Sequence, residues 1–118
     1  MYKNRTGKTG EAIAKRYLLN KGLKFLHSNY RFEKSEIDLI FIDQDKKLIL
    51  FFEVKTRRNK NFGEPEESIN NLKMEHLRKA AEGFIMNNEK YSGYDLRFDV
   101  ITIMMGEEIV IDHIENAF

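Results

Sequence analysis

The chain contains no cysteine and no tryptophan, and Pro65 is its only proline. Without cysteine, disulfide bonds and thiolate zinc sites are excluded. No proline- or glycine-rich linker, repeat or low-complexity tract divides the 118 residues, so we expect one domain over residues 1–118. The apolar fraction of 42% is typical of a globular protein and not of a disordered one.

Long apolar runs are also missing. No stretch approaches the roughly 20 apolar residues that span a bilayer, so we expect no membrane partner. The segment from Met1 to Thr9 is basic and polar, and no apolar stretch follows it as in a secretory signal. We therefore expect a cytoplasmic protein.

The chain has no large excess of charge of either sign, with 20 basic and 19 acidic residues and a net charge of +1. Net charge therefore neither favours nor excludes a nucleic-acid partner. The distribution is more informative. One short basic segment directly follows an apolar strand pattern and contains Lys55, Arg57, Arg58 and Lys60. Such a segment can hold a phosphate backbone.

Apolar periodicity predicts two helices and five strands. We expect helices near 10–21 and from Pro65 to about Asn88, and strands at 24–32, 36–43, 47–55, 95–105 and 108–114. A loop is expected at 59–64. The second helix has a predicted buried stripe formed by Ile69, Leu72, Leu77, Ala80, Phe84 and Ile85.

The order α-β-β-β-α-β-β indicates an α/β fold with a mixed sheet. The short polar link after residue 43 predicts an antiparallel hairpin of the strands at 36–43 and 47–55. Both strands are apolar on both faces, as interior strands of a covered sheet are. Helices before and after this hairpin would cover opposite faces, and a right-handed crossover would make the strand at 95–105 parallel to an earlier one.

Charged residues interrupt these two apolar strands, which is costly unless each charge is paired. Residues two apart share a strand face, so Glu53 lies with Lys55, and Glu36 lies with Asp38. In a tight antiparallel hairpin the start of one strand lies beside the end of the other. We therefore expect Asp38 and Glu53 to come close at one end of the sheet.

Two adjacent carboxylates repel each other, and a hard divalent cation such as Mg²⁺ or Mn²⁺ relieves the repulsion. Such an ion polarises a phosphodiester and lowers the pKa of a bound water. Lys55 beside it would stabilise charge that develops on the phosphoryl group. Glu11 would add a further ligand if the first helix packs over this end of the sheet.

Structural interpretations stay open for several of these residues. An ion pair between Asp38 and Lys55 would explain both charges without a metal. Lys73 lies on the apolar stripe of the second helix, and it either extends to solvent or projects over the carboxylate end of the sheet as a phosphate contact. For Asp99, which shares a face with Arg97, we expect a local ion pair or a hydrogen bond to a neighbouring loop.

The remaining candidates carry weaker signals. Arg31 is either a phosphate contact or a charge at a strand end. His27 and His113 lack the spacing of metal ligands, so we expect structural roles for both. His76 is expected at the surface.

The ordered set of an acid on the first helix, an acid in the second strand, Glu-x-Lys in the third and a lysine on the next helix resembles the PD-(D/E)xK nuclease superfamily. More closely, the chain resembles the uncharacterised YraN-like family, which is distantly similar to archaeal Holliday-junction resolvases. The resemblance covers nearly the whole chain. Its carriers are Gly10-Glu11, Ala14, Tyr17-Leu18, Asn29-Tyr30-Arg31, Glu36-Ile37-Asp38-Leu39-Ile40, Phe52-Glu53-Val54-Lys55-Thr56-Arg57, Phe62-Gly63, Lys73, Arg97-Phe98-Asp99-Val100 and His113-Ile114-Glu115-Asn116-Ala117-Phe118.

This resemblance implies a restriction-endonuclease-like mixed sheet flanked by helices. It implies Asp38 and Glu53 as ligands of Mg²⁺ or Mn²⁺, Lys55 as the catalytic lysine and Glu11 as an accessory acid. Ser35 stands where the family usually has glycine, a change that affects the turn but removes no ionisable group.

The leading functional hypothesis is a magnesium-dependent endonuclease that hydrolyses DNA, with branched or repair intermediates as candidate substrates. Its expected nucleic-acid contacts are Arg31, Arg57, Arg58, Lys60 and Lys73, with Glu36 in a supporting role. The alternatives are a nucleic-acid-binding module or scaffold that does not cut, and a protein–protein adaptor whose charges form ion pairs. A resolvase-like enzyme needs two active sites and hence a homodimer.

Overall fold

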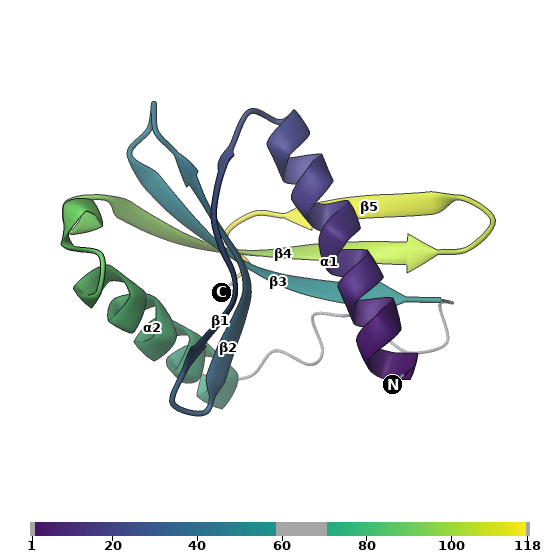
Figure 1. The fold of residues 1–118 in the computed structure, drawn as a ribbon, viewed down its shortest axis with the longest axis horizontal. Coiled ribbons are helices and arrows are strands. Elements are labelled where there is room, and N and C mark those ends of the chain that lie inside the picture. The colour runs from purple at the N-terminus through teal and green to yellow at the C-terminus, as the bar shows by residue number, and fades with distance from the viewer. Residues whose placement is uncertain (1, 59–70, 118) are drawn as a thin grey trace.

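The computed structural model describes residues 2–58 and 71–117. Its elements are α1 (Tyr2–Asn20), β1 (Lys24–Phe32), β2 (Ser35–Asp43), β3 (Leu48–Arg57), α2 (Asn71–Met86), a short 3₁₀ helix η3 (Glu89–Tyr91), β4 (Asp95–Met105) and β5 (Ile109–Ile114). The predicted order is confirmed, with η3 as an addition (Figure 1). Neither described helix is apolar enough over a sufficient length to cross a membrane.

The five strands form one mixed sheet in the order β1-β2-β3-β4-β5. β3 pairs in parallel with β4, from Leu48 opposite Asp95 to Arg57 opposite Met104. The other three pairings are antiparallel. The connection between β3 and β4 contains α2, so the predicted mixed sheet and its crossover are confirmed.

The two helices cover opposite faces of the sheet (Figure 1). Alternate residues of β3 point to opposite faces of the sheet. Ile49 and Phe51 pack toward α2, and Leu50 and Phe52 pack toward α1. All four side chains are buried, and burying each contributes about 1.5–3 kcal/mol. β3 is therefore the central strand of both cores, and the charged residues Glu53 and Lys55 directly follow its buried part.

Helix α1 begins at Tyr2, well before the predicted start near residue 10, and this prediction was wrong. The apolar stripe starts only at Ile13, so the preceding polar turns gave no hydrophobic signal. The predicted stop is confirmed: Gly22 has a φ of +89° and its amide donates to the Leu19 carbonyl at 3.0 Å. This is the left-handed helix cap that glycine favours.

Helix α2 buries Leu77, Ala80, Ala81, Gly83 and Phe84 against the sheet. The prediction that Leu72 belongs to this stripe was wrong, since Leu72 is 62% exposed. At 3.6 residues per turn, a residue five positions before Leu77 faces elsewhere, whereas Lys73, four positions before it, faces the sheet. The predicted loop at 59–64, the helix start at Pro65 and Ile69 lie outside the described residues.

Candidate functional site

The end of the β2–β3 hairpin carries the first acid of the candidate site. Strand pairing runs from Asp43 opposite Leu48 to Leu39 opposite Phe52. At the next position of β2, Oδ2 of Asp38 accepts a hydrogen bond from the backbone N–H of Val54 at 2.7 Å. This bond fixes the Asp38 carboxyl against β3, beside the residue that follows Glu53.

The environment of Asp38 opposes its ionisation. Burial raises the pKa of Asp38 to about 7, and the nearby carboxylates of Glu11, Glu53 and Glu36 add to the rise. The hydrogen bond from the Val54 amide lowers the pKa of Asp38, but it does not cancel the rise. Near neutral pH a substantial fraction of this carboxyl is therefore protonated, and a cation beside it would favour the ionised form.

Glu53 on β3 is the second acid, and two ammonium groups contact it. Its Oε1 is 3.0 Å from Nζ of Lys55 and also pairs with Nζ of Lys73 from α2. The Glu53 side chain is only 13% exposed. Its other oxygen, Oε2, is buried and has no hydrogen-bond partner among the described residues. A buried carboxylate oxygen without a donor is an acceptor that a cation can satisfy.

Lys55 and Lys73 are therefore both part of this site. Burial lowers the pKa of the Lys55 ammonium, Glu53 partly offsets this effect, and the charge of Lys73 lowers the pKa further. The expected shared face of Glu53 and Lys55 is confirmed. Of the two interpretations of Lys73, the structure favours the one in which it reaches over the carboxylate end. Among the described salt bridges, Lys55 pairs with Glu53 and none joins it to Asp38.

Helix α1 places Glu11 near Asp38 through an unusually close contact. A Cβ atom on Gly10 would overlap Oγ1 of Thr56 on β3, so only glycine allows the helix to lie this close to the strand. Burial raises the pKa of Glu11, an effect that Asn29 reduces and Glu36 enhances. The approach of the helix thus adds a third acid to the neighbourhood of Asp38.

Asn29 on β1 links two of the acids, and sequence reasoning did not assign it a role at the site. Its Nδ2 donates to Oε1 of Glu11 at 3.2 Å and to Oε2 of Glu36 at 3.3 Å. Asn29 has a φ of 52°, in the left-handed region that asparagine adopts more readily than most residues. An asparagine inside an otherwise regular strand pattern was the available signal.

The other residues predicted to contact phosphate, Arg31, Arg57, Arg58 and Lys60, have different surroundings. Arg31 is 80% exposed and pairs with Glu36 at 3.0 Å, where it supports an acid. Nη1 of Arg57 donates to the Thr56 carbonyl at 2.9 Å, and its Nε is buried without a partner among the described residues. Arg58 is exposed at the end of the described segment, and Lys60 lies outside it.

Asp99 belongs to a separate network on the α1 face of the sheet. Arg97 donates to both of its carboxylate oxygens at 2.9 Å, His113 lies 2.8 Å from Oδ2, and the Asn116 amide donates to Oδ1 at 2.9 Å. Burial alone would raise the pKa of Asp99, but these hydrogen bonds hold it below the ordinary value. The expected local ion pair and the structural role of His113 are confirmed.

The donor set at the hairpin end fits a hard cation with few protein ligands. The described residues contain no group of three or more histidines or carboxylates placed to hold a metal ion. Asp38 and Glu53 can supply two carboxylates, and Oε2 of Glu53 is a buried oxygen that no described residue satisfies. Mg²⁺ commonly uses one or two carboxylates and takes its other oxygens from water and phosphate.

Comparison with known proteins identifies the family. Residues 10–103 match the model of the uncharacterised protein family UPF0102. The chain is 41% identical to a UPF0102 protein of Alkaliphilus oremlandii, with 95% of this chain and 96% of that protein covered. It is 45% identical to one of Thermodesulfovibrio yellowstonii, with coverage of 95% and 94%, and 44% identical to one of a Sulfurihydrogenibium species, with coverage of 100% and 97%. The chain therefore belongs to the UPF0102 family, the YraN-like family of the PD-(D/E)xK-like nuclease superfamily.

Proposed function

We propose that this protein is a metal-dependent endonuclease that hydrolyses phosphodiester bonds in DNA, with branched or repair intermediates as substrates. The observation that carries the proposal is the state of Glu53, which has two ammonium groups on Oε1 and a buried Oε2 with no hydrogen-bond partner in the described part of the chain. Beside it lies Asp38, whose pKa is about 7. This combination of oxygen ligands and cations suits a phosphate-cleaving centre.

Asp38 and Glu53 would hold Mg²⁺ or Mn²⁺. When bound there, the ion would polarise the phosphodiester and lower the pKa of a coordinated water. The Val54 amide holds Asp38 in place through its Oδ2, which leaves the carboxyl oriented before any ligand arrives. Such preorganisation reduces the cost of ordering the ligands.

The two lysines supply positive charge for the phosphate. The ammonium groups of Lys55 and Lys73 both lie at Oε1 of Glu53, at the end of β3. Charged donors placed before the reaction stabilise the negative charge that develops on the phosphoryl oxygens. Glu11, held by Asn29, is the accessory acid next to Asp38.

Purified protein incubated with branched, nicked and linear DNA in Mg²⁺ or Mn²⁺ tests this proposal. We expect cleavage of at least one substrate, and a loss of at least about 100-fold in Glu53→Gln and Lys55→Ala, typical for removal of a catalytic group. Lys46→Ala, in the exposed turn between β2 and β3, is the matched control. Absence of cleavage on all substrates, together with metal binding that Asp38→Ala leaves unchanged, would refute the proposal.

One observation favours a second candidate, a nucleic-acid-binding module that does not cut. Glu53 already carries two ammonium partners, so its charge is compensated without a metal. In that case DNA binding that weakens with salt would persist in EDTA and in Asp38→Asn. The endonuclease proposal instead requires a rise in melting temperature with Mn²⁺, since a ligand of the native state stabilises it.

Cleavage of a four-way junction would also require two sites, and we propose that the active form is then a homodimer. Sedimentation of the protein with and without junction DNA would measure its stoichiometry. A single protein chain per cleaved junction would refute this part of the proposal.

A further inference from the structure

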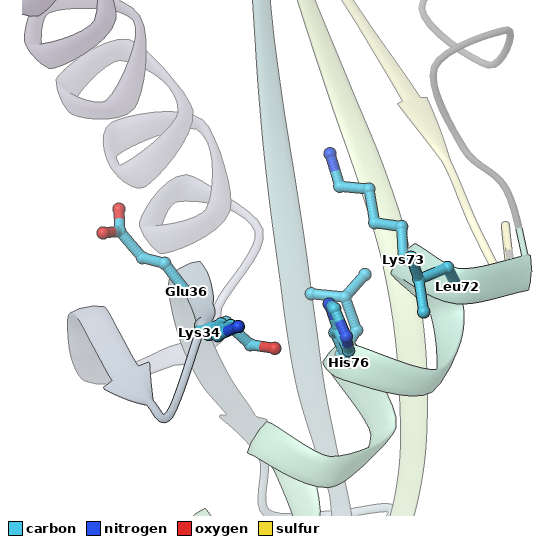
Figure 2. Close-up of a pocket in the computed structure, with 7 residues that line it drawn as sticks. Lys34, Glu36, Leu72, Lys73 and His76 are labelled. Carbon is cyan, nitrogen blue, oxygen red and sulfur yellow. The ribbon is translucent and has the colours of Figure 1, made fainter.

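A groove of about 310 Å³ lies between the turn that joins β1 to β2 and the first turns of α2 (Figure 2). Lys34 and Glu36 line it from the hairpin side, and Leu72, Lys73 and His76 line it from the helix. Sequence reasoning assigned no role to Lys34 and placed His76 simply at the surface. The groove and the carboxylate site share Lys73, whose ammonium contacts Glu53, so they are neighbours.

The charge of the groove favours an anion. Lys34 and Lys73 each add a positive charge, and the one acid among the described lining residues is Glu36. That acid is already engaged, since Arg31 lies 3.0 Å from Oε1 and Asn29 donates to Oε2 at 3.3 Å. A phosphate in this groove would therefore meet Lys34, and next to it Lys73, which also pairs with Glu53, without an uncompensated carboxylate in the described lining.

The helix side of the groove is suited to a nucleobase. Leu72 is 62% exposed although it is a large apolar residue, and the partly exposed imidazole of His76 lies one turn further along α2. In Figure 2, Leu72, Lys73 and His76 lie on α2, across the groove from Lys34 and Glu36. Aromatic rings, including that of histidine, and apolar side chains are the usual platforms for unpaired bases.

We propose that this groove binds one unpaired nucleotide next to the phosphate that is cut, its base on Leu72 and His76 and its phosphate on Lys34. This inference rests on the proposed nuclease function and narrows its substrate class. A groove of about 310 Å³ is at the lower limit of small-ligand sites, a size that suits a single nucleotide. The preferred DNA therefore has a single-stranded nucleotide at the cleavage point, as in an overhang, a flap or an open junction.

The test compares two fluorescently labelled DNAs, a blunt duplex and the same duplex with an unpaired overhang. Their binding is followed by fluorescence anisotropy, once in EDTA and once in Ca²⁺. We expect tighter binding of the overhang in at least one condition. Leu72→Ala and His76→Ala should each reduce this preference by about fivefold or more, the lower end of what one stacked base contributes. Lys34→Ala should weaken overhang binding selectively.

Matched controls use side chains of the same type away from the groove. Leu96→Ala on β4 and His27→Ala on β1 remove an exposed leucine and an exposed histidine, and both should keep the preference. Because Leu72 is largely exposed, its truncation should not change the melting temperature, which is measured in parallel.

Equal affinity for both DNAs in both conditions would overturn the inference. So would an equal loss on both DNAs in Leu72→Ala and His76→Ala, which would mean a general phosphate contact without base recognition. The two proposals fail separately. A preference for the overhang without cleavage would refute the nuclease function but support nucleotide binding in the groove. Cleavage without a preference would refute only nucleotide binding in the groove.

Discussion

Lys73 of α2 and Glu53 of β3 form a salt bridge across the open end of the sheet, although they are 20 residues apart in the chain. The bridge joins the crossover helix to the central strand at the point where Lys55 also meets Glu53. One carboxylate oxygen therefore serves two ammonium groups, and the other serves none among the described residues. A metal ion at Glu53 would therefore compete with two ammonium groups for Oε1, but with no described donor for Oε2.

Replacement of Lys73 by methionine should tighten Mn²⁺ binding several-fold, because a positive charge next to the metal ligand Glu53 is removed. The same change should weaken DNA binding and lower the free energy of unfolding by only about 1 kcal/mol, as expected for a partly exposed pair. Calorimetric titration with Mn²⁺ measures the affinity. Lys79→Met, an exposed lysine of the same helix, is the control. Unchanged or weaker Mn²⁺ binding in Lys73→Met would contradict the assignment of Glu53 as a ligand.

Asp38→Asn should stabilise the metal-free protein above pH 7. The pKa of Asp38 is raised from 3.8 to about 7, so between these values the folded state keeps a proton that the unfolded state has lost. The free energy of unfolding of the wild type therefore falls as pH rises through this window, by at most about 4 kcal/mol. Asparagine cannot ionise, and it can still accept the Val54 hydrogen bond.

Urea unfolding of the wild type and Asp38→Asn at several pH values measures this difference, which should be small near pH 4 and largest above pH 7. Added Mn²⁺ should stabilise the wild type and not the variant. Asp112→Asn, an exposed position on β5, should show neither effect. A loss of stability in Asp38→Asn at pH 8 would show that the charged form is favoured by contacts other than those described.

Asp99→Asn should destabilise the fold by about 3 kcal/mol at neutral pH, because it leaves buried donors of Arg97 and His113 without a charged partner. The pKa of Asp99 is held below its ordinary value, so its contribution is present above pH 4 and is lost as pH falls toward the folded-state pKa. The difference in free energy of unfolding between wild type and variant, measured with urea, should therefore become smaller at acid pH. A gap that stays constant with pH would contradict this account.

Gly10→Ala should lower both stability and any cleavage activity, since its Cβ would overlap Oγ1 of Thr56 and push α1 away from β3. Overpacking of this kind typically costs about 1–3 kcal/mol. The double variant Gly10→Ala with Thr56→Ala should recover much of the loss, since the overlapping atom is gone. Gly93→Ala, where an added Cβ meets nothing within 4 Å, is the control. Equal stability of Gly10→Ala and Gly93→Ala would refute the close contact.

The fold was largely predictable from the sequence because β2 and β3 are long apolar strands joined by a short polar turn. Such local signals determine strand position and pairing. The start of α1 was not predictable, since the residues before Ile13 have no apolar period. Leu72 was misplaced for a related reason: an apolar residue in a helix was assigned to the buried face although its spacing from Leu77 put it elsewhere.

The site was predictable without conditions where two residues lie on the same or neighbouring strands, whereas the prediction of Glu11 depended on how α1 packs. Glu53 and Lys55 follow from strand alternation, and Asp38 follows from the hairpin. The Lys73–Glu53 pair depends on how α2 packs, which no local pattern specifies, so its two interpretations remained open until the structure distinguished them. The contacts of Asn29 join residues of α1, β1 and β2, and the groove at His76 lies between the β1–β2 hairpin and α2. Spacing along the sequence does not predict contacts between such separate segments.

The parallel pairing of β3 with β4 also affects how the chain acquires its structure. β1, β2 and β3 are connected by short turns, so they can pair early, and the carboxylates of Asp38 and Glu53 would come together with them. β4 can join only after the crossover has been made, and contacts between distant segments form slowly. Until then the apolar strand β3 has an open edge, which is where non-native strand pairing begins. Variants that slow the docking of α2 should therefore aggregate during refolding even when the final fold is stable.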